Sequence, residues 1–514
     1  MIDAATLWDL VAERAAATPE REFLVDEGGR SLTFGAFRDL TEEVAAGLHA
    51  RGISEGTVVS WQLPTWIEAA VLVAALSRLG AVQNPMVPIY RHREVGFILD
   101  QLDPAIYIGT STWRDFDYQA MVAELAPGLD RLTVEPSTEG IGLPTGDPAS
   151  LPPPPVAPGD PADQAVRYIY YTSGTTSDPK GARHTEANVL HGAVINTTGV
   201  GLLAEDTVIM IFPFTHVGGT VILESVLQMA ARLVLTDAFV PDRTSELIKR
   251  LGVTVAPGAT PIHQAFVAVN RARPDEKLFE TVRVFPSGGA PMPPALFYEV
   301  KDELDSRGIV SGYGLTEAPL LTMGRTTDTD EQLSTTEGRP GPGVELRFLR
   351  EDGSECGPGE EGEIRARGPQ IMKGYYDSSL DAAAFDADGW FRTGDLGHRD
   401  ADGYVTISGR LKDVIIRKAE NVSAQEVENT LYTHSKVGDV AVIGLPDENT
   451  GERVCAVVVT AEGEDPLTFD EMTAHCKAAG LMMQKVPEQL EIVDALPRNN
   501  TGKVMKFVLK EQFS

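Results

Sequence analysis

The segment around Lys180 holds the residues whose types and spacing point most clearly to chemistry. A β-favouring run, Tyr168 to Tyr171, leads into a loop of glycine, serine and threonine, then into Pro-Lys-Gly and a helix-like stretch. Glycines let backbone N–H groups turn toward an anion, hydroxyls add donors, and a lysine adds a mobile positive charge. The sequence therefore predicts a phosphate-binding loop. Its binding groups would belong to Thr172, Ser173, Gly174, Thr175, Thr176 and Lys180.

The spacing within this loop excludes the commonest phosphate-binding motif. Gly174 is followed by TTSDPKG, whereas the common P-loop reads G-x-x-x-x-G-K-[ST]. An ordinary kinase or GTPase is therefore disfavoured. For an isolated cluster of this composition, a plain turn rich in small polar residues is at least as frequent as a binding site.

Further segments with chemically useful groups follow in order along the chain. They are PFTHVGG from Pro213, PSGGAPMPP from Pro286, SGYGLTEA from Ser311, GWFRTGD with SGRLKD, and LPRNNTGKVMK near the C-terminus. Taken singly, each has an ordinary structural explanation, such as a buried histidine, a turn aspartate or a surface lysine. Together with the phosphate-binding loop, the segments contain five charged groups at motif spacing, for which no common structural explanation exists. They are Lys180, Glu317, Asp395, Arg410 and Lys503.

Together these segments closely resemble the adenylate-forming superfamily of acyl-CoA synthetases, peptide-synthetase adenylation domains and beetle luciferases. YTSGTTSDPKG is similar to the family signature YTSGTTGxPKG and differs at Ser177, where glycine is usual. The side chain at this position would stiffen the loop slightly without removing a donor. The resemblance runs from about residue 168 to residue 506, and a more diffuse likeness lies upstream.

The resemblance implies a nucleotide site and assigns roles within it. Tyr313 would stack on adenine, Thr316 would hold phosphate, and Glu317 would bind Mg²⁺, a cation that prefers one or two carboxylates plus phosphate oxygens and water. Asp395 and Arg410 would hold the ribose hydroxyls. The full set implied for ATP is Thr172, Ser173, Gly174, Thr175, Thr176, Lys180, Gly288, Gly289, Ala290, Gly312, Tyr313, Gly314, Leu315, Thr316, Asp395, Arg410 and Lys503.

The catalytic residues implied by the resemblance are Lys503, Glu317 and His216. A lysine on a mobile domain supplies charge where the adenylation transition state needs it and is withdrawn afterwards. His216 occupies the position of a gating residue beside the acyl group. The acyl pocket would be lined by His216, Val217, Gly218, Pro257, Gly258, Gly289 and Leu320.

The expected substrate is an apolar carboxylic acid. In peptide-synthetase adenylation domains an aspartate in the segment that corresponds to PFTHVGG holds the amino group of the substrate, and this chain has none there. No carrier domain is expected to follow either, so an amino acid is disfavoured. The small apolar segments THVGGTVIL, VAPGATPI and EAPLLT suit a fatty chain, an alicyclic acid or a sterol side chain, and aromatic acids stay open.

The resemblance implies two half-reactions, in which Mg·ATP and the acid give acyl-AMP and coenzyme A then displaces AMP. The C-terminal domain would rotate between them about Lys412. Ala419 stands where the family usually has a glycine beside the coenzyme A channel. Luciferase-like oxidation of the adenylate and an acceptor other than coenzyme A remain alternatives. A binding protein built on a decayed synthetase is disfavoured, because the charged motif residues are retained.

The elements that position these residues indicate an α/β fold. Helix-like segments alternate with short β-branched strands, which favours helices packed on a mostly parallel sheet. With the resemblance, this predicts a large N-terminal domain of α/β layers with a small β-barrel-like subdomain, residues 1–409. A small, mobile α+β C-terminal domain would follow, residues 410–514. The proline-rich stretch from Leu143 to Pro161 predicts an exposed loop or linker.

The bulk composition narrows the partners and the location. The net charge of −31, without any block of Lys or Arg, argues against nucleic acid. Three scattered cysteines fit a reducing compartment. A signal peptide is not expected, because the N-terminal segment MIDAATLWDLVAERAA has no basic flank followed by an apolar stretch. An integral membrane segment is not expected either, since the longest apolar run is interrupted by Arg78. The expected location is the cytoplasm, and a homodimer is compatible with the sequence.

Overall fold

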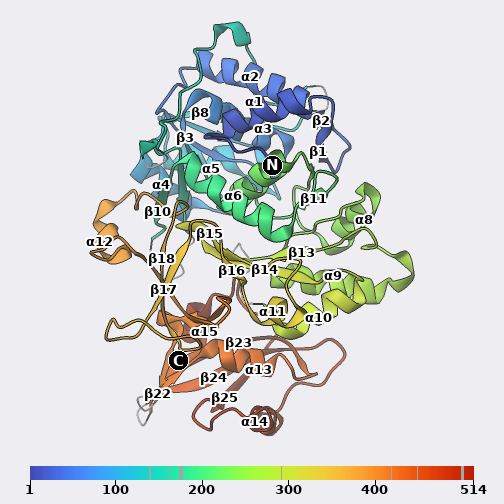
Figure 1. Cartoon of the computed structure of the whole chain (residues 1–514), viewed down its shortest axis with the longest axis vertical. Coiled ribbons are helices and arrows are strands. Elements are labelled where there is room, and N and C mark those ends of the chain that lie inside the picture. Colours follow the sequence, from blue (N-terminus) through green and yellow to red (C-terminus); the bar gives the residue numbers. More distant parts are fainter. Residues whose placement is uncertain are drawn as a thin grey trace.

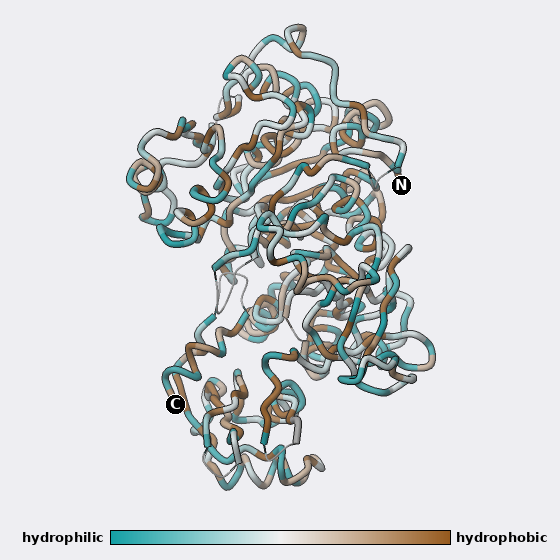
Figure 2. The backbone as a smooth tube through the Cα atoms, turned by 90° about the vertical axis from the view of Figure 1, so that its left-hand side faces the viewer, coloured by the Kyte–Doolittle hydropathy of each residue, from teal (hydrophilic) through white to brown (hydrophobic). Residues whose placement is uncertain are grey.

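The chain folds into a large N-terminal part and a smaller C-terminal lobe, seen in a computed structural model (Figure 1). The structure describes residues 1–137, 140–160, 163–172, 178–290, 292–417, 420–447, 450–498 and 503–514. The C-terminal lobe is set apart from the rest in the side view (Figure 2). Its apolar core is separate from the large core of the N-terminal part. The expected α/β class with a large and a small domain is confirmed.

Six strands form the first sheet of the N-terminal part. They are β3 (Val58–Gln62), β4 (Val82–Pro85), β5 (Ile106–Gly109), β8 (Asp130–Thr133), β9 (Tyr168–Tyr171) and β10 (Gly181–His184). Their order across the sheet is β10-β9-β4-β3-β5-β8, and every neighbouring pair is parallel except β9 with β10. The predicted parallel sheet is therefore present, with one antiparallel edge. A short hairpin, β6 (Thr112–Trp113) and β7 (Phe116–Asp117), lies beside it.

The second sheet is built from two groups of strands. The first group is β1 (Glu22–Asp26), β2 (Ser31–Thr33), β11 (Thr207–Met210) and β12 (Arg232–Leu235). The second is β13 (Phe285–Ser287), β14 (Ile309–Leu315), β15 (Ala318–Met323) and β16 (Arg339–Pro340). Parallel bridges from Val208 to Val255 and from Val255 to Val284 join the groups. The carboxyl ends of β11, segment 255–258, β13 and β14 therefore lie along one edge, where ligands bind in open α/β sheets.

Helices fill the space between and around these sheets. They are α1 (Leu7–Ala17), α2 (Phe34–Ala50), α3 (Ile67–Leu79), α4 (His92–Leu102), α5 (Tyr118–Leu125), α6 (Glu186–Val200), α7 (Val217–Met229), α8 (Pro241–Leu251), α9 (Thr260–Ala272), α10 (Pro294–Glu303), α11 (Asp330–Thr335) and α12 (Asp381–Ala384). Every residue of α3 is buried, because α3 contacts β1 of one sheet and β4 of the other. No helix in the described ranges is both long and apolar enough to span a bilayer.

A four-stranded antiparallel sheet forms the predicted small subdomain. Its strands are β17 (Glu345–Leu349), β18 (Gly362–Arg367), β19 (Phe391–Arg399) and β20 (Val405–Arg410). Directly after β20, the short 3₁₀ turn η5 (Leu411–Asp413) leads into the C-terminal lobe. The predicted boundary between residues 409 and 410 stays a prediction, and it falls at this connection.

The C-terminal lobe is a five-stranded sheet with helices packed on it. Its strands are β21 (Ile415–Arg417), β22 (Glu420–Val422), β23 (Val437–Asp447), β24 (Gly451–Thr460) and β25 (Gln489–Val493). Its helices are α13 (Ala424–Leu431), α14 (Phe469–Ala478) and α15 (Lys506–Phe513). Lys503 precedes α15, so the lobe carries this side chain to the N-terminal part.

Candidate active site

A cavity of about 920 Å³ opens at the carboxyl ends of the parallel strands and reaches the C-terminal lobe. Most of the residues predicted from sequence line it. They are Thr172, Lys180, His216, Val217, Gly218, Pro257, Gly258, Gly288, Gly289, Gly312, Gly314, Leu315, Thr316, Glu317, Leu320, Asp395, Arg410, Lys412 and Lys503. Tyr313 and Ala290 line an adjoining cavity of about 1060 Å³. The structure thus brings segments more than 300 residues apart to one place.

Asp395 and Arg410 form a cross-strand pair. β19 and β20 are antiparallel with Asp395 opposite Arg410, so the hairpin brings together two residues that are fifteen positions apart in the sequence. Arg410 Nε lies 3.1 Å from Asp395 Oδ1, and Tyr313 Oη donates to Asp395 Oδ2 at 2.6 Å. Asp395 is only 3% exposed. The carboxylate is therefore oriented by one contact on each oxygen before any ligand arrives.

Burial and the Asp395 carboxylate also raise the pKa of Tyr313 well above its ordinary value, so this hydroxyl stays a donor at neutral pH. Tyr313 belongs to β14 and lines the adjoining cavity. The stacking of Tyr313 on adenine remains a prediction, but the hydroxyl already has a defined partner.

Glu317 is held by a residue that the sequence reasoning missed, Tyr375. Tyr375 Oη donates to Glu317 Oε1 at 2.7 Å, and Lys180 Nζ lies 5.5 Å from the centre of the same ring. Tyr375 is 5% exposed and forms a bridge with Ala182 of β10. One tyrosine thus touches both the end of the phosphate loop and the predicted metal ligand. The pair is 58 residues apart, and no spacing or periodicity in the sequence links the two.

The phosphate loop departs from the predicted strand–loop–helix order. Residues 181–184 pair antiparallel with β9 as strand β10, so the loop connects two strands of a hairpin and α6 begins only at Glu186. Lys180 O accepts from Thr172 N at 3.0 Å, which closes the base of the loop. Ser173, Gly174, Thr175 and Thr176, like Ser177, lie outside the described residues.

Lys503 lies among charged groups from both parts of the chain. Burial, with the nearby cations Arg410 and Lys412, lowers the pKa of Lys503 to about 7, and Asp395 and Asp413 oppose this effect. Burial and Arg410 likewise lower the pKa of Lys412. The lobe is therefore positioned with Lys503 inside the cavity, next to the Asp395–Arg410 pair.

His216 caps the N-terminus of α7 and faces the predicted acyl pocket. Its Nδ1 accepts from Gly218 N at 3.1 Å, and burial lowers its pKa to about 4. The imidazole is neutral at physiological pH, and because Nδ1 is the acceptor, Nε2 carries the hydrogen. His216 is therefore a hydrogen-bond donor on the cavity side.

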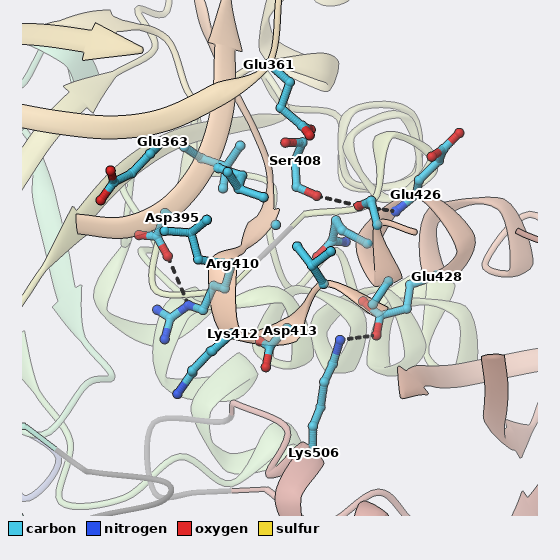
Figure 3. Close-up of a pocket in the computed structure, with 18 of the residues that line it drawn as sticks. Glu361, Glu363, Asp395, Ser408, Arg410, Lys412, Asp413, Glu426, Glu428 and Lys506 are labelled. Atoms are coloured by element: carbon cyan, nitrogen blue, oxygen red, sulfur yellow. Dashed lines mark hydrogen bonds and ion pairs between the residues drawn. The ribbon is translucent and has the colours of Figure 1, made fainter. Parts of the chain in front are cut away.

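The adjoining cavity separates the N-terminal part from the C-terminal lobe (Figure 3). Ser423 Oγ donates to Ser408 O at 2.6 Å across the junction, and Lys506 Nζ lies 2.7 Å from Glu428 Oε1 within the lobe. The figure shows Asp395, Arg410 and Lys412 on one side and Lys506 on the other. Ala419, predicted to border the coenzyme A channel, lies outside the described residues.

The side chains at the site fit Mg²⁺ bound together with a nucleotide better than a metal ion held by protein side chains alone. Within the described ranges there is no group of three or more His, Cys, Asp or Glu side chains that could hold a metal ion. Glu317 presents a single carboxylate, anchored through Oε1, to the cavity. One carboxylate with room for phosphate oxygens and water is what Mg²⁺ binding with a nucleotide requires.

Comparison with known proteins agrees with this geometry. The AMP-binding enzyme family model matches residues 11–376, and the AMP-binding enzyme C-terminal domain matches residues 426–503. The medium-chain fatty-acid–CoA ligase of Escherichia coli (strain K12) is 31% identical over 520 residues, covering 99% of this chain and 90% of that protein.

Two further similarities extend over nearly the whole chain. The 3-[(3aS,4S,7aS)-7a-methyl-1,5-dioxo-octahydro-1H-inden-4-yl]propanoyl:CoA ligase of Rhodococcus jostii is 31% identical, covering 98% of this chain and 100% of that protein. The solved structure of an amide bond synthetase from Marinactinospora thermotolerans superposes with a TM-score of 0.84 at 26% identity, covering 98% and 99% of the two chains. The chain therefore belongs to the AMP-binding enzyme family and is an adenylate-forming enzyme that activates a carboxylic acid through its acyl-AMP.

Proposed function

We propose that this enzyme joins an apolar carboxylic acid to coenzyme A, with ATP converted to AMP and pyrophosphate. The observation that carries the proposal is one continuous cavity, which joins Lys180, Glu317, the Asp395–Arg410 pair and Lys503 to an apolar pocket behind His216. Charged groups for a nucleotide and apolar walls for an acyl group meet where the carboxylate would attack the α-phosphorus.

In the proposed adenylation step, this chain's residues position the reactants and neutralise charge. Asp395 accepts from the ribose hydroxyls while Tyr313 and Arg410 fix its orientation. Lys180 and the phosphate loop hold the departing pyrophosphate. Lys503 lies between the attacking carboxylate and the α-phosphate. When bound, Mg²⁺ would be held by Glu317 and would supply further positive charge to the phosphates.

Coenzyme A as acceptor is supported by the second cavity and by the relatives. The cavity of about 1060 Å³ leads from the Asp395–Arg410 pair to the junction between the two parts of the chain, a path for a long thiol substrate. Two of the similar enzymes are named CoA ligases. The Marinactinospora thermotolerans structure, in contrast, is of an amide bond synthetase, so an amine is the main alternative acceptor.

The decisive experiment separates the two half-reactions. Acid-dependent exchange of labelled pyrophosphate into ATP, measured over a panel of fatty, alicyclic and aromatic acids, identifies the acid. Addition of coenzyme A should then release AMP and an acyl-thioester in equal amounts. If exchange occurs but no acyl-thioester forms, and an amide forms when amines are supplied, coenzyme A is not the acceptor. Light emission or O₂ consumption would instead indicate luciferase-like chemistry.

Replacing Tyr375 by phenylalanine should weaken the affinity of the enzyme for Mg²⁺ while leaving the protein folded. The change removes the hydrogen bond to Glu317 but keeps the ring beside Lys180. A hydrogen bond to a charged group is worth about 1.5–3 kcal/mol, so the Mg²⁺ concentration for half-maximal exchange should rise about ten-fold or more. Binding of Mn²⁺ with ATP, followed by electron paramagnetic resonance, should weaken in parallel.

The matched control for this variant is Tyr376→Phe, because Tyr376 is the neighbouring tyrosine and is 39% exposed, whereas Tyr375 is buried. It should keep the wild-type Mg²⁺ dependence. If Tyr375→Phe also keeps it, the hydroxyl does not position Glu317.

ATP binding should be coupled to proton uptake near pH 8. In the ligand-free arrangement Lys503 has a pKa of about 7, below the ordinary 10.5, so it binds fewer protons than an exposed lysine between these values. That arrangement therefore gains stability as the pH rises through this window. Phosphate oxygens beside Lys503 would favour the charged form and restore its proton.

Calorimetry in buffers of different ionisation enthalpy measures this uptake. Wild type should take up close to one proton per ATP at pH 8, and Lys503→Ala should take up markedly less. Equal uptake by the two proteins would show that Lys503 does not approach the phosphates.

A further inference from the structure

The acyl pocket follows one face of α7, starting from His216 at its N-terminus. Val217, Gly218, Val221 and Ile222 of this helix all line the cavity. Their positions, one turn apart in pairs, place them on a single helix face. The pocket therefore runs along the helix axis, away from the nucleotide end.

A polar side chain, Asn196 of α6, lines the same cavity farther along this face. Asn196 Nδ2 donates to Ser225 Oγ at 3.0 Å. Ser225 is nine residues beyond His216, which corresponds to roughly 13 Å along the helix at 1.5 Å per residue. An amide thus lies at the end of an apolar pocket that is remote from the reacting groups.

Two neighbouring glycines of α6 confirm that Asn196 is on the side facing the pocket. A Cβ at Gly192, one turn before, would lie 2.8 Å from Pro319 O and 3.3 Å from Val221 Cγ2. A Cβ at Gly199, one turn after, would lie 2.2 Å from Met323 Cγ. Pro319, Val221 and Met323 all line the cavity. Asn196 therefore lies on the face of α6 that packs closely against β15 and α7, between the contacts made at Gly192 and Gly199.

The hydrogen bonds around Ser225 fix which way the amide of Asn196 points. Ser225 Oγ lies 2.8 Å from Val221 O and 3.2 Å from Ala193 O, so its single hydrogen is donated to a backbone carbonyl. The hydroxyl must then accept from Asn196, which places Nδ2 against Ser225. Within the described residues, Asn196 Oδ1 receives no hydrogen bond.

An amide oxygen on an apolar wall is unfavourable unless a ligand or water donates to it. A hydroxyl is the group that matches it best, because a hydroxyl donates to Oδ1 and also accepts from the second hydrogen of Nδ2. A carboxylate or a plain methyl end would leave Oδ1 without a donor.

We propose that the acyl substrate carries a hydroxyl group roughly 10–13 Å from its carboxylate, and that Asn196 recognises it. This inference rests on the proposed acid activation and names the class of acid: an apolar skeleton hydroxylated at its remote end. Ser225 is a positioning residue for the amide, and Val221, Ile222 and Met323 enclose the skeleton between the two polar ends.

The test compares matched acids in the pyrophosphate exchange assay. Saturated fatty acids of about ten carbons are long enough, since an extended chain of that length spans on the order of 12 Å with ordinary carbon–carbon bonds. Each is paired with its ω-hydroxy counterpart. Wild type should show kcat/KM about two- to ten-fold higher for the hydroxy acid, the value of one hydrogen bond between neutral groups.

Asn196→Leu, which is similar in size and apolar, should reverse this preference, and Ser225→Ala should reduce it. The matched control is Thr198→Val, because Thr198 is on the exposed side of the same helix and bonds only to backbone carbonyls. It should keep the wild-type ratio. If Asn196→Leu does not fold, Ser225→Ala and the comparison of acid pairs with wild type still test whether Asn196 recognises a hydroxyl group.

Equal use of the plain and hydroxylated acids by wild type, or an unchanged ratio in Asn196→Leu, would overturn the inference while leaving acid activation intact. Absence of exchange with every acid, in contrast, would count against the proposed function itself. The two failures are therefore distinguishable in one set of measurements.

Discussion

Replacing Lys503 by alanine should remove acid-dependent ATP/pyrophosphate exchange, yet largely preserve thioester formation from supplied acyl-AMP and coenzyme A. Lys503 lies beside the Asp395–Arg410 pair, where burial and two neighbouring cations disfavour its charge. That arrangement is unfavourable without a ligand but complementary to the anion formed in the adenylation step. Loss of one such preorganised charge lowers a rate by about 10²–10³-fold.

The control is Lys477→Ala, which removes an exposed lysine of α14 in the same lobe. It should leave both half-reactions at the wild-type rate. Quenched single turnovers with labelled acid separate the acyl-AMP from the thioester. An equal loss in the two half-reactions of Lys503→Ala would indicate damage to the lobe, not loss of a charge that serves adenylation.

The site was largely predictable where chemistry depends on local motifs. Asp395 and Arg410 could be paired from sequence because a β-hairpin fixes their spacing, and the register of β19 and β20 places them opposite each other. Lys503 could be assigned for a similar reason, since its motif is short and contiguous. Local backbone geometry sets each of these positions.

Contacts between distant loops could not be predicted in this way. Tyr375 reaches Glu317 only because residues 373–376 are hydrogen-bonded along β10, through Lys373 N to Arg183 O and Tyr376 N to Gly181 O. Asn196 acquires its position through the packing of α6 on α7. Neither contact has a period or a fixed separation in the sequence.

In the fold too, local sequence patterns were predictive, whereas pairings that depend on distant segments were not. Alternating helices and strands predicted a parallel sheet, and the crossover helices make that pattern readable. The four residues of the antiparallel strand β10 include glycine and alanine and carry little strand signal of their own, so the sequence predicts a helix-like stretch there. Its pairing with β9 is decided by the hairpin and by the 373–376 segment.

Lys412→Pro should leave adenylation nearly intact and stop the enzyme at the acyl-adenylate. Lys412 lies in the 3₁₀ turn η5, between the last strand of the subdomain and the C-terminal lobe. Proline fixes φ near −65°, which suits a 3₁₀ turn, so the arrangement that places Lys503 in the cavity should be retained. If the lobe rotates about this residue, as the resemblance implies, the rotation requires another φ, which proline does not permit.

Exchange should therefore stay within a few-fold of wild type, while acyl-CoA formation falls by about 10²-fold, as expected when a required conformational step is blocked. Lys412→Ala is the control, because it removes the same charge, which lies beside Arg410, without restricting φ. It should form thioester far faster than the proline variant. Rapid-quench measurements would show acyl-AMP accumulating only with proline. Unimpaired thioester formation in Lys412→Pro would place the hinge elsewhere, since a fixed φ at the true pivot must separate the two half-reactions.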